Sequence, residues 1–131
     1  MYDNLSDPNR AEKKTRKQED RADLQEFIAA MRLDPESRRT WIYDHVDLPR
    51  MASYLAGMFL VADMDCCHKN YYAYRDSDGS GEWWYMPWDL DLSFGHNWTG
   101  HYFDDTLYPG APLFVGRNNA LLGALITHPE W

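Results

Sequence analysis

The sequence contains only two cysteines, Cys66 and Cys67, and they are neighbours. Across a trans peptide bond, neighbouring Cα atoms lie ~3.8 Å apart, which is shorter than the usual span of a disulfide. A framework of disulfides is therefore excluded, and the sequence predicts two partly buried thiols at these positions.

Long apolar runs are also lacking. No stretch approaches the ~20 apolar residues that a membrane-spanning helix needs, so no membrane span is expected in this chain. The opening residues 1–7 are polar, whereas a signal peptide has an apolar stretch after a basic start. We therefore expect no signal peptide in this chain either.

Basic residues are scarce in most of the chain. Residues 1–40 hold nine Lys or Arg and nine Asp or Glu, so the whole net charge of −8 arises from residues 41–131. Binding to nucleic acid through phosphates needs a basic surface, and we expect no nucleic-acid partner. The acidic part is suited instead to divalent cations, which take oxygen ligands.

The length of the chain suits one domain of ordinary size. Residues 1–18 are polar and mixed in charge, which indicates a loop or disordered segment, and the domain is expected to fill residues 19–131. Apolar periodicity predicts four helices, over residues 19–33, 35–45, 48–62 and 117–127. Residues 96–115 show no clear periodicity and are expected to be irregular, and a further helix is expected to begin at His128.

The third of these helices is expected to be central. Asp47 is a suitable N-cap, and the residues from Leu48 to Ala62 are apolar nearly all round, which is typical of a buried helix. This helix leads the chain directly to Asp63 and Asp65.

A β-hairpin is expected next. Tyr71–Arg75 and residues 82–88 are rich in aromatic side chains, which favour strands. Residues 76–81 between them supply the Asp and Gly that tight turns require. Pairing of the two strands would bring Asn70 close to Trp88.

The hairpin would also gather two acidic pairs at one end, Asp63 with Asp65 and Asp89 with Asp91. Carboxylates held in one place repel one another. Such a gathering normally binds a cation or carries out chemistry, so this end of the hairpin is the candidate site.

Several side chains at this end suit chemistry. Asp65 at the end of a buried helix can accept a proton from a hydroxyl, and Asn70, five residues later, can ligate a metal; the alternative is a helix cap and a turn residue. Asp89 and Asp91 follow a strand and can hold Mg²⁺ on a phosphate, or they are two exposed loop aspartates. His68 lies in the same stretch and can orient a carboxylate or contact a phosphate.

Two other metal sites are not favoured. Residues 76–81 resemble the opening of a calcium loop, but an EF-hand needs Glu at the twelfth position, where this chain has Pro87. A hairpin turn is expected there. His96, His101 and Asp104 suit zinc in type, but their spacing is not diagnostic and no cysteine pair joins them, so scattered loop residues are expected.

Taken together, these residues resemble the core of the CotH family, the spore-coat-type secreted kinases. The resemblance is carried by Asp65, by His68-Lys-Asn70 with the Tyr-Tyr-Ala-Tyr that follows, and by the Asp/Gly turn. Its most specific part is Pro87-Trp-Asp-Leu-Asp-Leu-Ser-Phe-Gly95. It covers about residues 20–130.

The resemblance implies an α+β fold, a mostly helical kinase-like C-terminal lobe with a central β-hairpin that carries the acidic site residues. It implies that Asp65 is the catalytic aspartate and that Asn70, five places on, binds the metal and nucleotide. Asp89 then matches the metal-binding aspartate, with Asp91 as a second ligand, and His68 contacts the nucleotide. ATP would be the phosphoryl donor, with Mg²⁺ or Mn²⁺ bridging its phosphates.

The implied function is metal-dependent phosphoryl transfer to Ser or Thr hydroxyls of surface or coat proteins, at a secreted or cell-surface location. A kinase also needs a loop that covers ATP and a Lys on a strand. The four lysines of this chain lie outside strand-like segments. The chain is therefore expected to be the C-terminal-lobe portion of a longer protein, truncated at both ends and inactive by itself.

Two alternatives stay open. Asp89-Leu-Asp91-Leu-Ser93 nearly fits the Asp-x-Asp pattern of other metal-dependent transferases or phosphatases, although the haloacid-dehalogenase class needs a downstream Lys that this chain lacks. The second alternative is a non-catalytic structural module of a cell envelope or spore coat, because metal-binding residues can persist without turnover.

Overall fold

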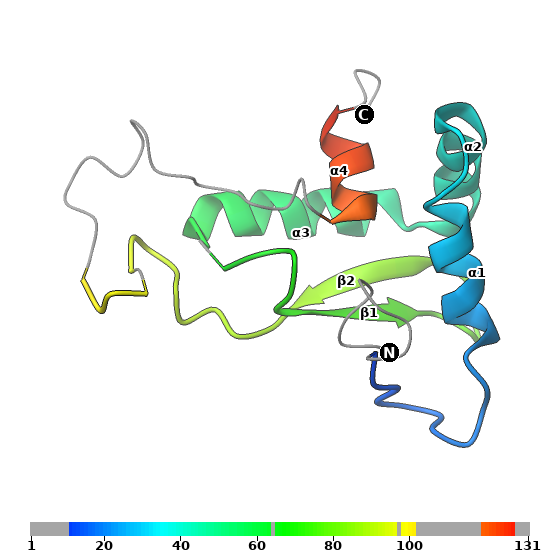
Figure 1. Ribbon diagram of the computed structural model, residues 1–131, viewed down its shortest axis with the longest axis horizontal. Coiled ribbons are helices and arrows are strands. Elements are labelled where there is room, and N and C mark those ends of the chain that lie inside the picture. Colours follow the sequence, from blue (N-terminus) through cyan, green and yellow to red (C-terminus); the bar gives the residue numbers. More distant parts are fainter. Residues whose placement is uncertain (1–10, 64, 97, 102–118, 128–131) are drawn as a thin grey trace.

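The computed structural model describes residues 11–63, 65–96, 98–101 and 119–127. These residues form four helices and one two-stranded antiparallel sheet, which confirms the α+β class. The elements, in chain order, are α1 (Ala22–Ala30), α2 (Pro35–His45), α3 (Leu48–Val61), β1 (Tyr71–Arg75), β2 (Trp83–Pro87) and α4 (Ala120–Thr127). Figure 1 shows α3 lying along the hairpin, with α1 and α2 at one end of it. The kinase-like lobe and the boundary at residue 18 stay predictions.

Helix α1 begins three residues later than the periodicity predicts. The carboxylate of Asp20 accepts the backbone N–H of Ala22 at 3.1 Å, and residues before this bond do not join the helix. Leu24, Phe27 and Ala30 form its buried face. The helix ends at Ala30 because the next residues turn, with Leu33 N–H bonded to the carbonyl of Ala30 at 3.1 Å.

Helix α2 has the bounds that its sequence predicts. The side chain of Asp34 accepts the N–H groups of Glu36 and Ser37, both at 3.1 Å, and Pro35 occupies the first helical position, where its missing N–H costs nothing. Ile42 is buried, and the ring of Trp41 packs edge-on against Phe27 of α1. Local capping and one apolar face are sufficient to define this helix.

Helix α3 begins as predicted and ends one residue early. Asp47 caps it by accepting the N–H of Arg50 at 3.0 Å, and Ala62 leaves the helix with a φ of +50°. The expectation that this helix is buried nearly all round is wrong for the described part of the chain, because Leu60 is 78% exposed. The buried face consists of Met51, Tyr54 and Met58, since α3 packs on β2.

The hairpin follows the predicted pairing. Tyr71 lies opposite Pro87 and Arg75 lies opposite Trp83. The turn closes through the N–H of Gly81, which donates to the carbonyl of Asp76 at 2.8 Å. Gly81 has a φ of +79°, which glycine adopts without a steric penalty. The strand residues on the face toward the core are Tyr71, Ala73, Trp83 and Tyr85.

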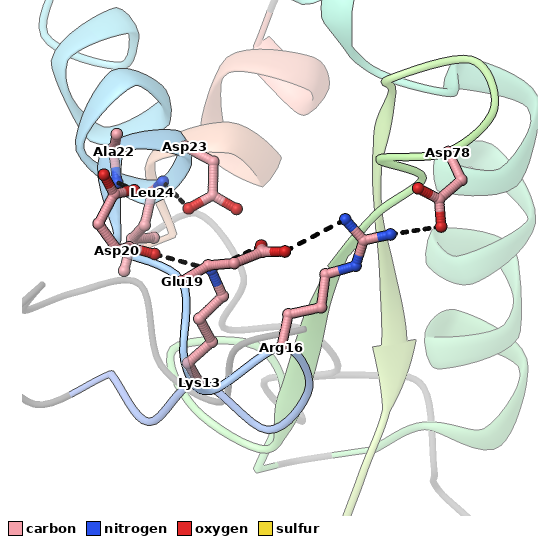
Figure 2. A network of polar contacts seen from close by, with 8 residues as sticks. All are labelled: Lys13, Arg16, Glu19, Asp20, Ala22, Asp23, Leu24 and Asp78. Atoms are coloured by element: carbon pink, nitrogen blue, oxygen red, sulfur yellow. Dashed lines mark hydrogen bonds and ion pairs between the residues drawn. The ribbon is translucent and has the colours of Figure 1, made fainter.

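The loop before α1 is tied to the body by charged side chains (Figure 2). Lys13 Nζ donates to the carbonyl of Asp20 at 2.7 Å, and Lys13 also pairs with Glu19 at 3.5 Å. Arg16 pairs with Glu19 and with Asp78 in the hairpin turn. The loop therefore contacts a turn 62 residues away, although such exposed ion pairs contribute little free energy.

The connection between α3 and β1 contains the two cysteines. Both are buried, and the structure joins Cys66 and Cys67 as a disulfide between neighbouring residues. This pairing differs from the two partly buried thiols that the sequence predicts.

The remaining expectations concern segments at the edge of the described part. The predicted helix at residues 117–127 is observed as Ala120–Thr127. Most of residues 96–115, and the helix expected from His128, lie outside the described residues. Among the residues that the structure describes, no helix has the length and apolar character needed to cross a membrane.

Candidate active site

The C-terminal end of α3 changes the direction of the chain toward the candidate site. Ala62 donates its N–H to the carbonyl of Phe59 and Asp63 donates to that of Met58, both at 3.2 Å. With Ala62 in the left-handed region, this pair of bonds forms a Schellman C-cap. The cap turns the chain sharply, and the first residue after it, Asp63, is buried at 1% exposure.

The Asp65 side chain is held in the site by a hydrogen bond and an ion pair. Its Oδ2 accepts Asn70 Nδ2 at 2.8 Å and pairs with Lys69 Nζ. Its Oδ1 lies 3.9 Å from Nε2 of His68 and accepts no hydrogen bond from the described residues. One oxygen is thus held in place, and the other is left for a further partner.

Asp63 binds the backbone of Asp65 through its side chain. Its Oδ1 accepts the backbone N–H of Asp65 at 3.0 Å, while its Oδ2 is buried and has no hydrogen-bond partner among the residues that the structure describes. Burial raises the pKa of the Asp63 carboxyl, and the negative charges of Asp65 and Asp91 raise this pKa further. The site therefore contains a buried carboxyl that resists ionisation next to two other acids.

The second acidic segment comes to the same end of the hairpin. Trp88 N–H donates to the carbonyl of Asn70 at 3.0 Å, as the expected strand pairing requires. Phe94 N–H donates to the carbonyl of Val61 at 2.7 Å, which ties the loop after β2 to the end of α3. In Figure 1, the end of α3 and the loop after β2 lie on the left side of the view, toward which the start of β1 also faces.

Asp89 and Asp91 lie on this loop and are exposed. Asp89 has a φ of +59°, a conformation that Asp tolerates better than most residues. Within the described ranges neither carboxylate accepts a hydrogen bond, although the carbonyl of Asp91 lies 2.8 Å from Nδ1 of His96. Both carboxylates are therefore open to a cation from solvent.

The donor set fits a hard divalent cation. Asn70 uses its Nδ2 on Asp65, which leaves its amide oxygen available at the end of the hairpin from which the loop with Asp89 and Asp91 departs. The described residues contain no group of three His, Cys, Asp or Glu side chains arranged to hold a metal by themselves. Mg²⁺ is usually bound by one or two carboxylates together with phosphate oxygens. A site with few protein ligands is therefore compatible with a metal ion that binds together with a nucleotide.

The zinc alternative has no support from the described geometry. His96 contacts the Asp91 carbonyl, and His101 is exposed. Asp104 lies outside the described residues. The turn at residues 76–81 closes by backbone bonds from Gly79 and Gly81 to Asp76, as expected for a hairpin.

Two residues of the site were missed at the level of sequence. Lys69 pairs with Asp65, but a Lys four residues after an Asp predicts a contact only on a helix, and this stretch is a loop. Asn119 is buried, and its Nδ2 donates to the carbonyl of Cys67 at 3.1 Å. Its Oδ1 caps α4 by accepting the N–H groups of Leu121 and Leu122.

The capping signal of Asn119 was present in the sequence, since Asn before an apolar helix is a preferred N-cap. The apolar periodicity predicts a helix from Arg117, which places Asn119 inside the helix rather than at its start. The contact with Cys67 spans 52 residues, and no local pattern predicts a contact of that separation.

Comparison with known proteins gives one family and one curated relative. The family model described as CotH kinase protein matches residues 2–131. The protein named "Inner spore coat protein H" of Bacillus subtilis (strain 168) is 31% identical over 87 residues, which are 66% of this chain and 24% of that protein. The chain thus spans about a quarter of the relative's length. No solved structure matches the chain significantly.

Proposed function

The chain belongs to the CotH family, and on this premise we propose that it carries the catalytic loop of a metal-dependent protein kinase. The reaction would transfer the terminal phosphoryl group of ATP to Ser or Thr hydroxyls. The observation that carries this proposal is the difference in hydrogen bonding between the two carboxylate oxygens of Asp65. Oδ2 is fixed by Lys69 and Asn70, while Oδ1 accepts no hydrogen bond within the described part of the chain.

A general base must be oriented and must keep a free lone pair within reach of the hydroxyl proton. Asp65 meets both conditions through its two oxygens. The pattern of an Asp followed five places later by an Asn is also that of a kinase catalytic loop, and here the two side chains are hydrogen-bonded. In this proposal Asp65 orients the acceptor hydroxyl and takes its proton.

Lys69 is the cation nearest to the proposed base. Its ammonium group contacts Asp65 Oδ2 and its side chain is 48% exposed, so it can turn towards an incoming phosphate. Phosphoryl transfer depends on positioning and on neutralising charge on the transferring oxygens. We assign Lys69 this second role, with His68 as a further contact to the nucleotide.

Asn70, Asp89 and Asp91 would hold Mg²⁺ or Mn²⁺ through their oxygens. When bound, the metal would bridge and partly neutralise the phosphates of ATP. The exposure of Asp89 and Asp91 supports this assignment, since these carboxylates have no partner among the described residues that a metal would need to displace.

The relative carries a spore-coat name. We therefore propose that this chain also acts at a coat or cell surface, and that its substrates are proteins of that surface.

One observation favours a second reading, a non-catalytic module of a coat or envelope. The Asp65 side chain is only 7% exposed and is already paired with Lys69, as in an ion pair that serves stability. The two readings differ in what happens when Asp65 is neutralised without changing its shape.

The test is phosphate transfer by the full-length protein, with Asp65→Asn compared with wild type. We expect the turnover number to fall by about 10²–10⁴-fold, the usual contribution of a general base, while Mg²⁺–ATP binding persists. Asp44→Asn is the matched control, because Asp44 is exposed on α2, away from the site. Equal turnover in wild type and Asp65→Asn, or no turnover in either, contradicts the proposal and favours the structural module.

A further inference from the structure

Two buried polar side-chain atoms near the site have no hydrogen-bond partner among the residues that the structure describes. They are Oδ2 of Asp63 and Oγ of Ser93. Asp63 is 1% exposed and Ser93 is 8% exposed, so neither atom is open to bulk solvent. Buried polar groups in folded proteins are nearly always bonded to protein or to bound water, because an unmade bond is costly there. We therefore expect each atom to have a partner beyond the contacts described above.

The two residues lie on segments that a backbone bond already joins. Phe94 donates its N–H to the carbonyl of Val61 at 2.7 Å. Ser93 directly precedes Phe94, and Asp63 follows Val61 by two residues, where each step along the chain moves the Cα by ~3.8 Å. Burial raises the pKa of the Asp63 carboxyl, and the charge of Asp91 raises it further. The loop after β2 therefore lies within electrostatic range of this carboxyl.

The two atoms are complementary in hydrogen bonding. A carboxylate oxygen accepts hydrogen bonds, and a serine hydroxyl has one O–H to donate. A bond to an ionised acceptor is stronger than one between neutral groups. Rotation about the Cα–Cβ bond of Ser93 moves its Oγ between three staggered positions, and one buried water can join two polar groups that do not touch. A single link, direct or through one water, would thus satisfy both atoms.

Such a link would join the two acidic segments of the site. The other oxygen of Asp63 accepts the backbone N–H of Asp65 at 3.0 Å. Ser93 follows Asp91 by two residues, and the chain changes between them from the exposed Asp91 to the buried Leu92 and Ser93. Ser93 therefore lies where the exposed loop enters the protein interior, beside the segment that carries the proposed base.

From this arrangement we propose that Ser93 is a positioning residue of the site. Its hydroxyl binds the free oxygen of Asp63, directly or through one water, and so fixes the loop that carries Asp91 relative to the backbone of Asp65. This inference rests on the proposed kinase function, in which the base and the metal must keep a set separation. A displacement of ~1 Å in such a site can cost ~10²-fold in rate.

The link is tested by hydrogen exchange of the full-length protein, with mass spectrometry of fragments that cover residues 61–67. Ser93→Ala should raise the exchange rate of this segment about 5-fold, as expected for the loss of one hydrogen bond. Ser93→Thr keeps the hydroxyl and should restore slow exchange. Ser53→Ala is the matched control and should change nothing, because Ser53 is exposed on α3 and its hydroxyl donates to the carbonyl of Pro49.

A double variant shows whether the two side chains act through one contact. Asp63→Ala removes the acceptor, so adding Ser93→Ala to it should raise exchange in residues 61–67 no further. Asp63→Asn keeps the shape of the side chain without its charge, and in this background Ser93→Ala should have a smaller effect than in wild type. Circular dichroism checks that each variant folds, and the single variants of Ser93 decide the question if Asp63→Ala does not.

The positioning role is tested by comparing turnover with nucleotide binding. Ser93→Ala should lower the turnover number by about 10-fold or more, because the base and the metal loop lose their fixed separation. The Kd for Mg²⁺–ATP should stay nearly the same, since the carboxylates of Asp89 and Asp91 remain present. Ser93→Thr should recover turnover. A residue that serves stability alone would leave turnover unchanged wherever the variant stays folded.

The outcomes are distinct for the two proposals. Unchanged exchange in Ser93→Ala, or additive effects in the double variant, overturns the link. A confirmed link with an unchanged turnover number overturns the positioning role. A confirmed link with no phosphate transfer in any of the proteins, wild type included, overturns the kinase assignment and leaves the link in place.

Discussion

The two acidic segments of the site are held in opposite ways. Asp65 is buried and bonded to Lys69 and Asn70, with Asp63 fixing its backbone. Asp89 and Asp91 are exposed on a loop, and within the described ranges their carboxylates accept no hydrogen bond. A group that must take a proton in one geometry benefits from rigid support, whereas groups that bind a metal from solvent must stay accessible. The contrast therefore suggests separate roles for the two segments.

The largest effect on turnover among the following variants is expected at Lys69. Lys69→Met removes the cation beside Asp65 and should lower the turnover number by about 10²–10³-fold, as loss of one preorganised charge-stabilising group does. Lys17→Met is the control, because Lys17 is exposed on the loop before α1. Steady-state phosphate transfer by the full-length protein is the measurement, and a change below threefold would remove Lys69 from the mechanism.

The rigid segment also depends on Asn119. Asn119→Ala removes the cap of α4 and leaves the carbonyl of Cys67 without its side-chain donor. Loss of a cap and of a buried hydrogen bond should lower the free energy of unfolding by about 2 kcal/mol. Urea denaturation measures this change, and Asn119→Asp, which keeps the capping oxygen, should recover part of it. An unchanged midpoint in Asn119→Ala would show that α4 does not support the loop.

The buried carboxyl of Asp63 should make the stability of the fixed segment depend on pH. Because the pKa of Asp63 is raised in the folded protein from its ordinary value of 3.8, its contribution to stability is present at low pH and is lost as the pH rises through the raised pKa. Asp63→Asn keeps an oxygen for the Asp65 N–H and removes the charge. We expect the variant to be about 1 kcal/mol more stable than wild type at pH 7, where the buried charge is costly.

Thermal unfolding between pH 4 and pH 8 provides the measurement for Asp63. The difference between wild type and Asp63→Asn should grow as the pH rises. A constant difference across this range would mean that Asp63 does not titrate differently in the folded and unfolded states.

The exposed segment should show the smallest effect on stability. Asp89→Asn changes an exposed side chain that accepts no hydrogen bond from the described residues, and such substitutions usually alter the free energy of unfolding by less than about 0.5 kcal/mol. Urea denaturation in the absence of metal tests this. A loss similar to that of Asn119→Ala would mean that the two segments are held alike.

Much of the fold can be predicted from local sequence patterns such as helix caps and turn residues. The caps Asp34 and Asp47, each followed by a proline in the first turn, define where α2 and α3 begin. The Asp/Gly turn defines the hairpin and hence the contact between Asn70 and Trp88. These features depend on residues close together in sequence, so pattern and turn chemistry predict them.

The parts that escaped prediction depend on distant residues. The exposure of Leu60 follows from which face of α3 meets β2, and an apolar sequence alone does not select a face. The pairing of Lys69 with Asp65 depends on how the loop folds. The residues of the candidate site were thus predictable by type and spacing, whereas their division into a fixed and an open segment was not.

The most direct test of this division is calorimetric titration of Mg²⁺–ATP into the full-length protein, in wild type, Asp89→Ala and Asp65→Asn. We expect binding to be lost in Asp89→Ala and kept in Asp65→Asn, because both carboxylates proposed to hold the metal lie in the exposed segment. Loss of binding in Asp65→Asn with full binding in Asp89→Ala would contradict the assignment of the metal to the exposed segment.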